Sequence, residues 1–531
     1  MKATPTSSAL NTKRAMKTAE NNRISAVDSI FKSMIGVIDD PENGFSGFQG
    51  VYFKPWGSRL SLGYQEQLLK FIADAERIAK LCPLKYGEGG YRFFNGKIYE
   101  PVTEDEIRMA WVKFLRYYHI VEMLKDRQVY KESFLKTIEY YNVLNVRLDL
   151  VAFSNGVLDL STMKFNKFSP KYHVTYFHPY RYDPKAECPK WMSFLKEVLP
   201  DKTARVILQM FLGLGLIERG TAFNACEGTE KAKIELCLIL IGRGGNGKSV
   251  VYEAARGVFG PQRISGVDYD DLTATGDEGM RARRLLRDAI FNWTSDSDSR
   301  TFGRRRSGMF KRIVSGEPVT DRAIGHDVTE NYRMPYLVFN LNAMPGTDDD
   351  SLGFIRRLQF IPFDVAIPKE RQNKSLSAEL IKEYPGIFNW IIRGMKELKR
   401  RKFVFPSCEA SQRKVLLMQM ESNVVVGFVN AYNMRPCPDF DGEVCAEISA
   451  TRLLAAAEKF CKDNDFPPPS GQLFGAAMRK MGFNKRRKAD GPVYSIYGCD
   501  LKRLGQGFVI NEEEARGPYV EDKNSFISKD D

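Results

Sequence analysis

The sequence is poor in the residues that build metal and redox sites. Only four of its 531 residues are histidine and nine are cysteine, and no two cysteines have the Cys-x-x-Cys spacing. This pattern argues against a zinc ribbon, a thioredoxin-like redox motif and a histidine-rich metal centre. Scattered cysteines are typical of reduced thiols in a cytosolic protein, so we expect a cytoplasmic location.

Long apolar stretches are also missing. No segment approaches the ~18 consecutive apolar residues that a membrane-spanning helix needs, so we expect no membrane association. The first 25 residues are polar and basic and lack the apolar core of a secretory signal, which predicts a disordered tail. The chain instead has an excess of positive charge, because 79 lysines and arginines outnumber 66 acidic residues by 13. A basic surface attracts phosphate backbones.

Pattern and composition divide the chain into several domains, as its length requires. The apolar run Leu236–Ile241 predicts a strand buried on both faces of a parallel sheet. Further apolar runs alternate with helical segments, which predicts an α/β core behind an α-rich N-terminal region. The predicted domains are 1–85 (role unknown, disordered at first), 86–218 (α+β), 219–400 (the α/β core), 401–510 (helices and a hairpin) and 511–531 (acidic and disordered).

The region 401–510 has the pattern of a DNA-binding domain. Helices predicted at Thr451–Asn464 and Gly471–Met481 precede a hairpin built from Lys485–Lys488 and Pro492–Tyr497, the order typical of a winged helix. In winged helices the second helix lies in a DNA groove and the wing contacts the backbone. The residues predicted to contact DNA here are Arg479, Lys480, Lys485, Arg486, Arg487 and Lys488.

A phosphate-binding loop follows the apolar strand of the core. The segment Gly242–Ser249 satisfies the pattern G-x-x-x-x-G-K-[ST] and lies between a predicted strand and a predicted helix. Its glycines let backbone N–H groups face nucleotide phosphates, while Lys248 reaches the β and γ phosphates and Ser249 ligates Mg²⁺. The residues predicted to bind ATP are Gly242, Gly244, Gly245, Asn246, Gly247, Lys248 and Ser249.

The same glycines also fit a dinucleotide fingerprint. Gly242, Gly244 and Gly247 spell G-x-G-x-x-G, and Asp268 lies about where a ribose-binding acid is expected. However, the segment before Asp268 is poor in apolar residues, and Lys248 has no role in a dinucleotide site. We therefore favour ATP over a dinucleotide and over a purely structural turn.

Three further features along the core fit an ATPase. Asp296 and Asp298 follow an apolar strand and are candidates for the acid that holds Mg²⁺ and orients water, although a solvated acidic turn is an alternative. Asn342 ends another apolar strand and is a candidate to polarise the attacking water, although a turn-forming asparagine before a proline is also common. Arg356 and Arg357 are candidate arginine fingers for a neighbouring subunit's ATP, or else a solvated pair.

A second basic cluster precedes the candidate acids. Its members suit contact with DNA or phosphate, but a solvated helix face explains such a run equally well. The four residues of this cluster are Arg281, Arg283, Arg284 and Arg287.

Taken together, these motifs resemble superfamily III helicases, in particular the phage/plasmid and poxvirus-type primase–helicase group. The order of Walker A loop, acid, strand-end asparagine and paired arginines is similar to that group. The segments that carry the resemblance are Phe153–Leu160, Tyr182–Trp191, Phe310–Arg322, Asn342–Pro345 and Arg356–Phe363.

The resemblance implies an AAA+-like P-loop fold and a hexameric ring with ATP between subunits. It also implies 3′-to-5′ movement on single-stranded or forked DNA, during replication of a phage, plasmid or other mobile element in a bacterial host's cytoplasm. A hairpin after the Gly-Glu-Pro segment is expected to present basic residues to DNA, here Lys311, Arg322 and His326.

Two departures from the family pattern stand out. The usual acid of this group is a glutamate directly after the strand, whereas this chain offers Asp296 as the metal ligand and Asp298 beside it. The first 90 residues show neither zinc-finger spacing nor paired carboxylates, so we expect a helicase without a primase domain and a separate primase or initiator as partner.

Three functions remain open on the sequence alone. The first is an ATP-dependent DNA helicase, and the second is a replication initiator that binds and opens origin DNA with little processive unwinding. The third is a small-molecule kinase, which the basic charge and the winged-helix pattern disfavour.

Overall fold

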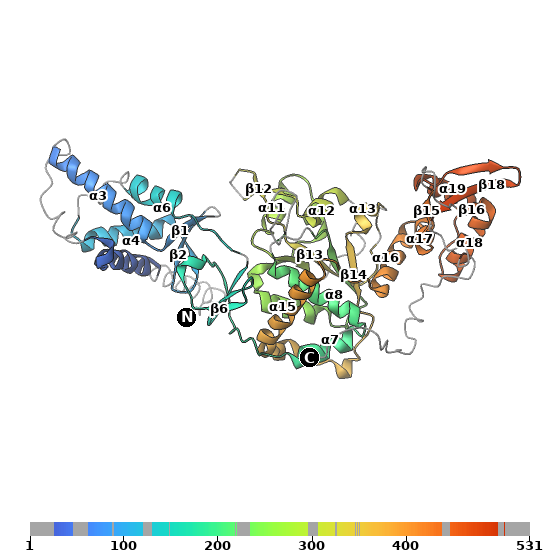
Figure 1. Cartoon of the computed structure of the whole chain (residues 1–531), viewed down its shortest axis with the longest axis horizontal. Helices are drawn as coiled ribbons and strands as arrows, with labels where there is room; N and C mark the ends of the chain where they lie inside the picture. Colours follow the sequence, from blue (N-terminus) through green and yellow to red (C-terminus); the bar gives the residue numbers. More distant parts are fainter. Residues whose placement is uncertain are drawn as a thin grey trace, which may run out of the picture. The chain divides into compact units, whose positions relative to one another are not determined.

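The computed structural model describes residues 26–45, 62–87, 90–120, 130–147, 149–217, 219, 234–295, 306–323, 327–345, 347, 349, 351–437, 446–497 and 504. The chain divides into two compact units, Met1–Asp183 and Pro184–Asp531 (Figure 1). The predicted α+β domain extended to residue 218. In the structure, the helices within residues 184–218 belong to the second unit instead.

Helices and a small sheet share one apolar core in the first unit. Trp111, Phe114 and Phe134 lie at its centre, with Trp111 in ring contact with both phenylalanines. The antiparallel sheet has the order β1-β2-β3, and its β2–β3 turn contains Asn95-Gly96. The elements are a helix over 26–39, α3 (Leu62–Leu81), β1 (Leu84–Gly87), β2 (Gly90–Phe94), β3 (Tyr99–Val102), α4 (Glu104–Tyr117), the π-helical η3 (Tyr130–Leu135) and α6 (Lys136–Tyr141).

A second sheet of the first unit contains one of the family-like segments. Its strands β6 (Lys164–Asn166), β5 (Gly156–Asp159), β4 (Leu150–Phe153) and β7 (Phe177–His178) lie in that order. Asn155, at the turn between β4 and β5, accepts a 2.9 Å hydrogen bond from the Tyr182 backbone and donates one of 3.1 Å to its carbonyl. Two of the five segments that resemble the primase–helicase group, Phe153–Leu160 and Tyr182–Trp191, therefore meet at this turn.

A five-stranded parallel sheet forms the centre of the second unit, as the α/β prediction requires. The strand order is β14-β8-β13-β10-β9, and every neighbouring pair is parallel. All five residues of β8 and all six of β13 are buried, which explains their continuous apolar sequence. The strands are β8 (Cys237–Ile241), β9 (Ile264–Ser265), β10 (Phe291–Thr294), β13 (Tyr336–Leu341) and β14 (Leu358–Pro362).

Helices surround this sheet. Figure 1 shows α8 beside α15, and the two helices are in extensive contact. These helices are α7 (Pro189–Val198), α8 (Lys202–Gly213), α9 (Lys248–Phe259), α10 (Tyr269–Thr273), α11 (Gly276–Arg284), α12 (Ser307–Val314), α13 (Leu352–Ile355), α14 (Leu376–Leu380) and α15 (Tyr384–Arg400). A separate antiparallel hairpin consists of β11 (Val319–Asp321) and β12 (Thr329–Asn331).

The C-terminal part of the second unit contains the predicted two helices and hairpin. Phe428, Phe460, Phe474 and Tyr494 contribute to its apolar core. Its elements are α16 (Glu409–Ser422), α17 (Val424–Ala431), β15 (Arg435–Pro436), β16 (Ala446–Ser449), α18 (Ala450–Asp463), α19 (Gly471–Lys480), β17 (Lys485–Lys488) and β18 (Gly491–Tyr497). In this part β18 is central, pairing with β15, β16 and β17.

Two sequence expectations concern compartment. No helix in the described part of the chain is long and apolar enough to cross a membrane. Cys82, Cys188, Cys237, Cys408 and Cys461 are free and buried, as expected, but Cys437 is disulfide-bonded. The expectation of reduced thiols throughout is therefore wrong at Cys437, because residue spacing does not reveal which thiols the fold brings together.

Candidate functional site

The predicted phosphate loop connects the buried strand β8 to the first turn of α9. Gly247 has a φ of 90° directly before the helix, a conformation that only glycine adopts without strain. A Cβ at Gly242 would lie 2.2 Å from both the Phe363 carbonyl oxygen and Asn246 Nδ2, so no side chain fits there. The tight turn between strand and helix therefore depends on these two glycines.

Lys248 is held against this loop. Its side chain is 5% exposed, and Nζ donates hydrogen bonds to the Gly242 carbonyl and, at 3.1 Å, to Asn246 Oδ1. Asn246 in turn donates from Nδ2 to the Phe363 carbonyl at 2.7 Å. The ammonium group thus lies inside the curve of the loop, where a phosphate group would compete for it.

The remaining loop residues face solvent. Gly244, Gly245 and Ser249 are exposed, and nothing lies within 4 Å of a Cβ built on Gly244. An open loop of glycines at a helix N-terminus offers several backbone N–H donors to an anion. This arrangement can bind a nucleotide polyphosphate without rearranging the protein core.

Two further segments of the chain flank the phosphate loop, one on each of two sides, and form its walls. The segment after β14 contacts it, because Ile367 N donates to the Gly245 carbonyl at 3.3 Å. On another side, α7 contributes Phe194, whose ring lies 2.8 Å from a Cβ built on Gly247. Arg371 of the first wall forms a 3.1 Å ion pair with Glu197 of α7. Neither wall has a short motif, so only the tertiary structure identifies it.

The strand order brings the ends of two other strands next to the loop. Gly242 N donates to the Leu341 carbonyl at 3.1 Å, so the carboxyl end of β13 borders the loop directly. Asn342 is the next residue and is exposed. The carboxyl end of β10 is adjacent to β13, with Thr294 paired to Phe339. Parallel strands therefore place the phosphate loop, Asn342 and the carboxyl end of β10 at one end of the sheet.

The candidate acids follow β10 in the sequence. Asp296 and Asp298 both lie outside the described residues. Within the described ranges, no group of three or more acidic, histidine or cysteine side chains is arranged to hold a metal ion. The predicted Mg²⁺ site would combine the Ser249 hydroxyl, which is exposed at the helix start, with Asp296.

The two candidate finger arginines have different surroundings. Arg357 is buried and donates from Nη2 to Glu235 Oε2 at 3.0 Å and to Ser315 Oγ at 2.9 Å. The Arg356 side chain is 67% exposed and lies 3.5 Å from Glu235. Arg357 is thus part of the internal packing, whereas Arg356 faces solvent.

Both arginines lie at the amino ends of the parallel strands, whereas the phosphate loop lies at their carboxyl ends. They precede β14, which runs parallel to β8 with Leu358 opposite Cys237. The five residues of β14 span about 16 Å at about 3.3 Å per residue. An arginine side chain at the amino end of β14 therefore does not reach the loop of its own chain.

The predicted hairpin after the Gly-Glu-Pro segment is present as β11 and β12. Arg322 follows β11 and forms an exposed ion pair with Asp277, at 3.1 Å from Nη1 to Oδ1. His326 lies outside the described residues.

Lys311 comes from α12 rather than from the hairpin, and its Nζ lies 2.8 Å from Asp349 Oδ2. Partial burial alone would raise the pKa of Asp349, but hydrogen bonds from Lys311, Ser307 and Ser351 outweigh it and hold that pKa well below the usual range.

The predicted basic residues of the C-terminal part are exposed. Every residue of β17, Lys485 through Lys488, is exposed, as are Arg479 and Lys480 at the end of α19. Lys488 is paired with Glu447 of β16. A lysine- and arginine-rich edge strand also prevents edge-to-edge pairing, so exposure alone does not assign a DNA contact.

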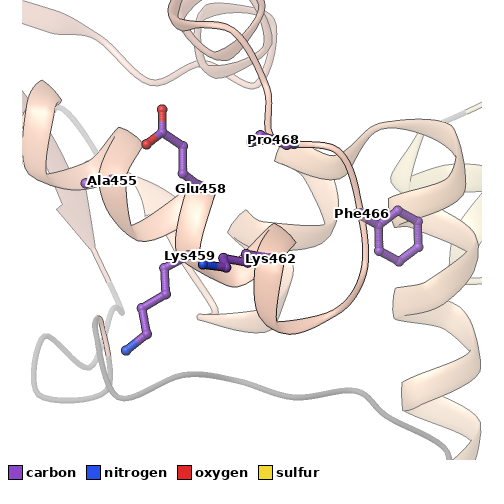
Figure 2. Close-up of a pocket in the computed structure, with 6 residues that line it drawn as sticks. All are labelled: Ala455, Glu458, Lys459, Lys462, Phe466 and Pro468. Carbon is purple, nitrogen blue, oxygen red and sulfur yellow. The ribbon is translucent and has the colours of Figure 1, made fainter.

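A shallow groove on α18 is a separate feature. Ala455, Glu458, Lys459 and Lys462 line it from one face of the helix, and Phe466 and Pro468 line it from the following turn (Figure 2). None of these residues belongs to the phosphate loop or its walls. The groove mixes acidic, basic and apolar groups, and it identifies no ligand.

Comparisons with known proteins agree with the upstream motifs. Residues 75–200 match the family model described as "D5 N terminal like". This range contains both Phe153–Leu160 and Tyr182–Trp191. A protein of Invertebrate iridescent virus 6, named "Putative helicase 184R", is 26% identical over 290 residues. The match covers 47% of this chain and 28% of that protein, so the chain spans less than a third of its relative.

Solved structures give a more distant likeness. The apo structure of the C-terminal region of NrS-1, in its A form, aligns over 77% of this chain and 93% of its own, with a TM-score of 0.42 and 11% identity. A second apo structure of that region, residues 305–718, aligns over 78% and 95% with a TM-score of 0.38 and 10% identity.

Proposed function

We propose that this chain is the ATP-driven motor of a DNA helicase that serves replication of a virus, phage, plasmid or other mobile element. The observation that carries the proposal is the buried Lys248 inside a glycine loop, at the sheet edge where β8, β13 and β10 end. The likeness to a viral protein named as a helicase supports the same function.

In this proposal the loop binds the polyphosphate of ATP. Lys248 exchanges its hydrogen bonds to Gly242 and Asn246 for the β and γ phosphates, and the loop N–H groups contact the remaining oxygens. Ser249 and Asp296 would hold Mg²⁺, which would supply charge neutralisation at the phosphates. Asp298 and Asn342 are proposed to orient the attacking water.

Arg356 is the proposed arginine finger, and it acts in trans. Its exposure and its position at the far edge of the sheet from its own loop support this assignment. Arg357 is then a supporting residue that holds Glu235 and Ser315. A site completed by a neighbour requires an oligomer with repeated head-to-tail contacts, and we propose the hexameric ring of superfamily III helicases.

The proposed nucleic-acid substrate is single-stranded DNA at a fork, tracked in the 3′-to-5′ direction. Lys311, Arg322 and His326 are proposed to contact DNA near the hairpin, although Lys311 must first leave Asp349. A C-terminal winged helix, with Arg479, Lys480 and Lys485–Lys488, is proposed to bind duplex DNA. A separate primase or initiator is the proposed partner.

Exposed basic residues on both α19 and β17 also favour a second candidate function. A replication initiator would use them to bind origin DNA and would use ATP to open it without sustained unwinding. The two functions differ in whether ATP hydrolysis drives strand displacement over long duplexes.

ATP hydrolysis by the full chain tests the proposal, with and without single-stranded DNA. Lys248→Ala is compared with Lys396→Ala, which removes an exposed lysine of α15. We expect DNA to stimulate the wild type and the Lys396 variant, and the Lys248 variant to be inactive. Hydrolysis indifferent to DNA would favour a small-molecule P-loop enzyme. Stimulated hydrolysis without strand displacement would favour the initiator.

A further inference from the structure

The basic cluster before β10 contacts the hairpin formed by β11 and β12. Arg283 and Arg287 direct their guanidinium groups to β11, the first strand of the hairpin. Arg287 binds the carboxylate of Asp321, and Arg284 lies close to it. Of the four clustered arginines, Arg283 and Arg287 therefore bind protein groups, whereas the Arg284 side chain stays 40% exposed. The sequence offered two interpretations of this cluster, a DNA or phosphate contact and a solvated helix face. Neither includes these contacts within the protein.

Asp321 is the centre of these contacts. It is 0% exposed, yet its two oxygens accept hydrogen bonds from Arg287 at 2.6 and 2.9 Å. Thr329 Oγ1 donates to Asp321 at 2.8 Å from the opposite strand, β12. Arg284 Nη1 adds a longer contact of 3.7 Å. One buried carboxylate thus joins both strands of the hairpin to the segment after α11.

Neighbouring residues of β11 are fixed to the same helix. Arg283 Nε donates to the Thr320 carbonyl at 3.1 Å, and its Nη1 donates to the Leu272 and Ala274 carbonyls. Burial lowers the pKa of this guanidinium group. The three backbone carbonyls accept hydrogen bonds from it in place of water. On the other side of Asp321, Arg322 N donates to the Met280 carbonyl at 3.3 Å. Three successive residues of the hairpin are therefore held.

The charge distribution indicates why these residues are matched. A carboxylate without solvent contact is costly unless it is paired and hydrogen-bonded, and Asp321 has both kinds of partner. The arginine that pairs with it, Arg287, stands four residues before Phe291, the first residue of β10. The loop-side end of the hairpin ladder is thus joined to the segment that enters β10.

We infer that Asp321 and Arg287 are positioning residues for DNA tracking, connecting the loop-side end of the hairpin, where Asp321 pairs with Thr329, to the strand that leads to the nucleotide site. This inference rests on the proposed helicase function. The pair does not touch DNA or nucleotide. The pair holds Arg322, the residue after Asp321, in a fixed position relative to β10. A movement at the carboxyl ends of the strands would then move the hairpin together with β10.

The test uses the full chain with Asp321→Asn, Arg287→Lys and a control, Lys396→Ala. The asparagine keeps the size of Asp321 but removes its charge, and the lysine keeps the charge of Arg287 but removes the two-pronged contact. Lys396 is an exposed lysine of α15 that belongs to none of the predicted sites. ATP hydrolysis without DNA, stimulation by single-stranded DNA, strand displacement and thermal unfolding are measured for each.

We expect both variants of the pair to keep DNA-independent hydrolysis within about twofold, while DNA stimulation and strand displacement fall by about tenfold. The salt dependence of single-stranded DNA binding should also become less steep, because a displaced hairpin makes fewer phosphate contacts. Lys396→Ala should behave as the wild type in these assays.

Two results would overturn the inference. Stimulation equal to the wild type in both variants would show that the pair has no positioning role. A parallel loss of DNA-independent hydrolysis and thermal stability, in the milder Arg287→Lys variant as well, would show a purely structural role. A wild type whose hydrolysis does not respond to DNA would instead refute the proposed function, so the two failures are distinguishable.

Discussion

Trp293 of β10 donates a 3.0 Å hydrogen bond from Nε1 to Asn340 Oδ1 of β13, and both side chains are completely or almost completely buried. Trp293 also lies against Tyr252 of α9, with ring centroids 5.7 Å apart. This contact joins the strand that leads to the candidate acids, the strand that leads to Asn342 and the helix that begins with Lys248. It links two neighbouring strands of the sheet to the helix that follows the phosphate loop.

Removing this hydrogen bond should destabilise the second unit. Trp293→Phe leaves the buried Asn340 amide without its donor, and an unpaired buried polar group costs about 1–3 kcal/mol. Adding Asn340→Leu removes the orphaned amide, so the double variant should regain much of the loss. Chemical denaturation of the single and double variants measures both changes. A double variant less stable than Trp293→Phe would show that Asn340 contributes through other contacts.

Two glycines of the phosphate loop, buried Gly242 and exposed Gly244, should respond very differently to an added methyl group. Gly242→Ala places a Cβ 2.2 Å from the Phe363 carbonyl oxygen, whereas Gly244→Ala meets nothing within 4 Å. We therefore expect Gly242→Ala to abolish binding of a fluorescent ATP analogue. Gly244→Ala, its matched control, should bind within about threefold of the wild type, since it is neither crowded nor strained. Normal binding by Gly242→Ala would contradict the loop geometry described above.

Local patterns predicted much of this fold. The apolar run at β8, the glycine loop and the first turn of α9 follow one another in sequence, so their connection needs no tertiary information. The same holds for α18, α19 and the β17–β18 hairpin, which short-range periodicity defines. The parallel arrangement of the sheet follows from alternating strands and helices.

Side-chain partners far apart in sequence were not predictable. Lys311 and Arg322 were singled out for their charge, but the partners that engage them, Asp349 and Asp277, are 38 and 45 residues away. Likewise, adjacent Arg356 and Arg357 are equivalent as letters and differ only because the fold buries one beside Glu235. Charge predicts what a residue can bind, whereas burial and packing determine which group it meets first.

The ion pair between Arg322 and Asp277 should compete with DNA. Asp277→Asn removes the carboxylate that neutralises Arg322 in the absence of DNA, and the pair is exposed enough that its removal costs little stability. We expect the affinity for single-stranded DNA to rise by about two- to fivefold. Fluorescence anisotropy at fixed salt measures this change.

The control for this experiment is Glu317→Gln, which removes the exposed partner of Arg312 at 3.6 Å. Its DNA affinity should change less than that of Asp277→Asn. If neither Asp277→Asn nor Arg322→Ala alters the affinity, Arg322 is not a DNA contact.

Loss of Arg357 should affect folding, and loss of Arg356 should affect catalysis. Arg357→Ala leaves Glu235 and Ser315 without their buried partner and should lower the free energy of unfolding by about 3 kcal/mol. Arg356→Ala removes a side chain that is 67% exposed, so thermal unfolding should be nearly unchanged while ATP hydrolysis falls by at least about a hundredfold. Equal stability of the two variants would contradict the different burial of these arginines.

Mixing two inactive variants tests whether Arg356 acts in trans. An Arg356→Ala subunit keeps an intact phosphate loop, and a Lys248→Ala subunit keeps an intact arginine. If the site forms between subunits, hybrid interfaces will pair the intact loop of one chain with the intact arginine of the next, and hydrolysis will reappear on mixing. Because β14 separates the two groups by about 16 Å within a chain, an arginine acting in cis could not give this result. Mixtures that remain inactive, although size measurements show that the subunits have exchanged, would exclude Arg356 as the finger.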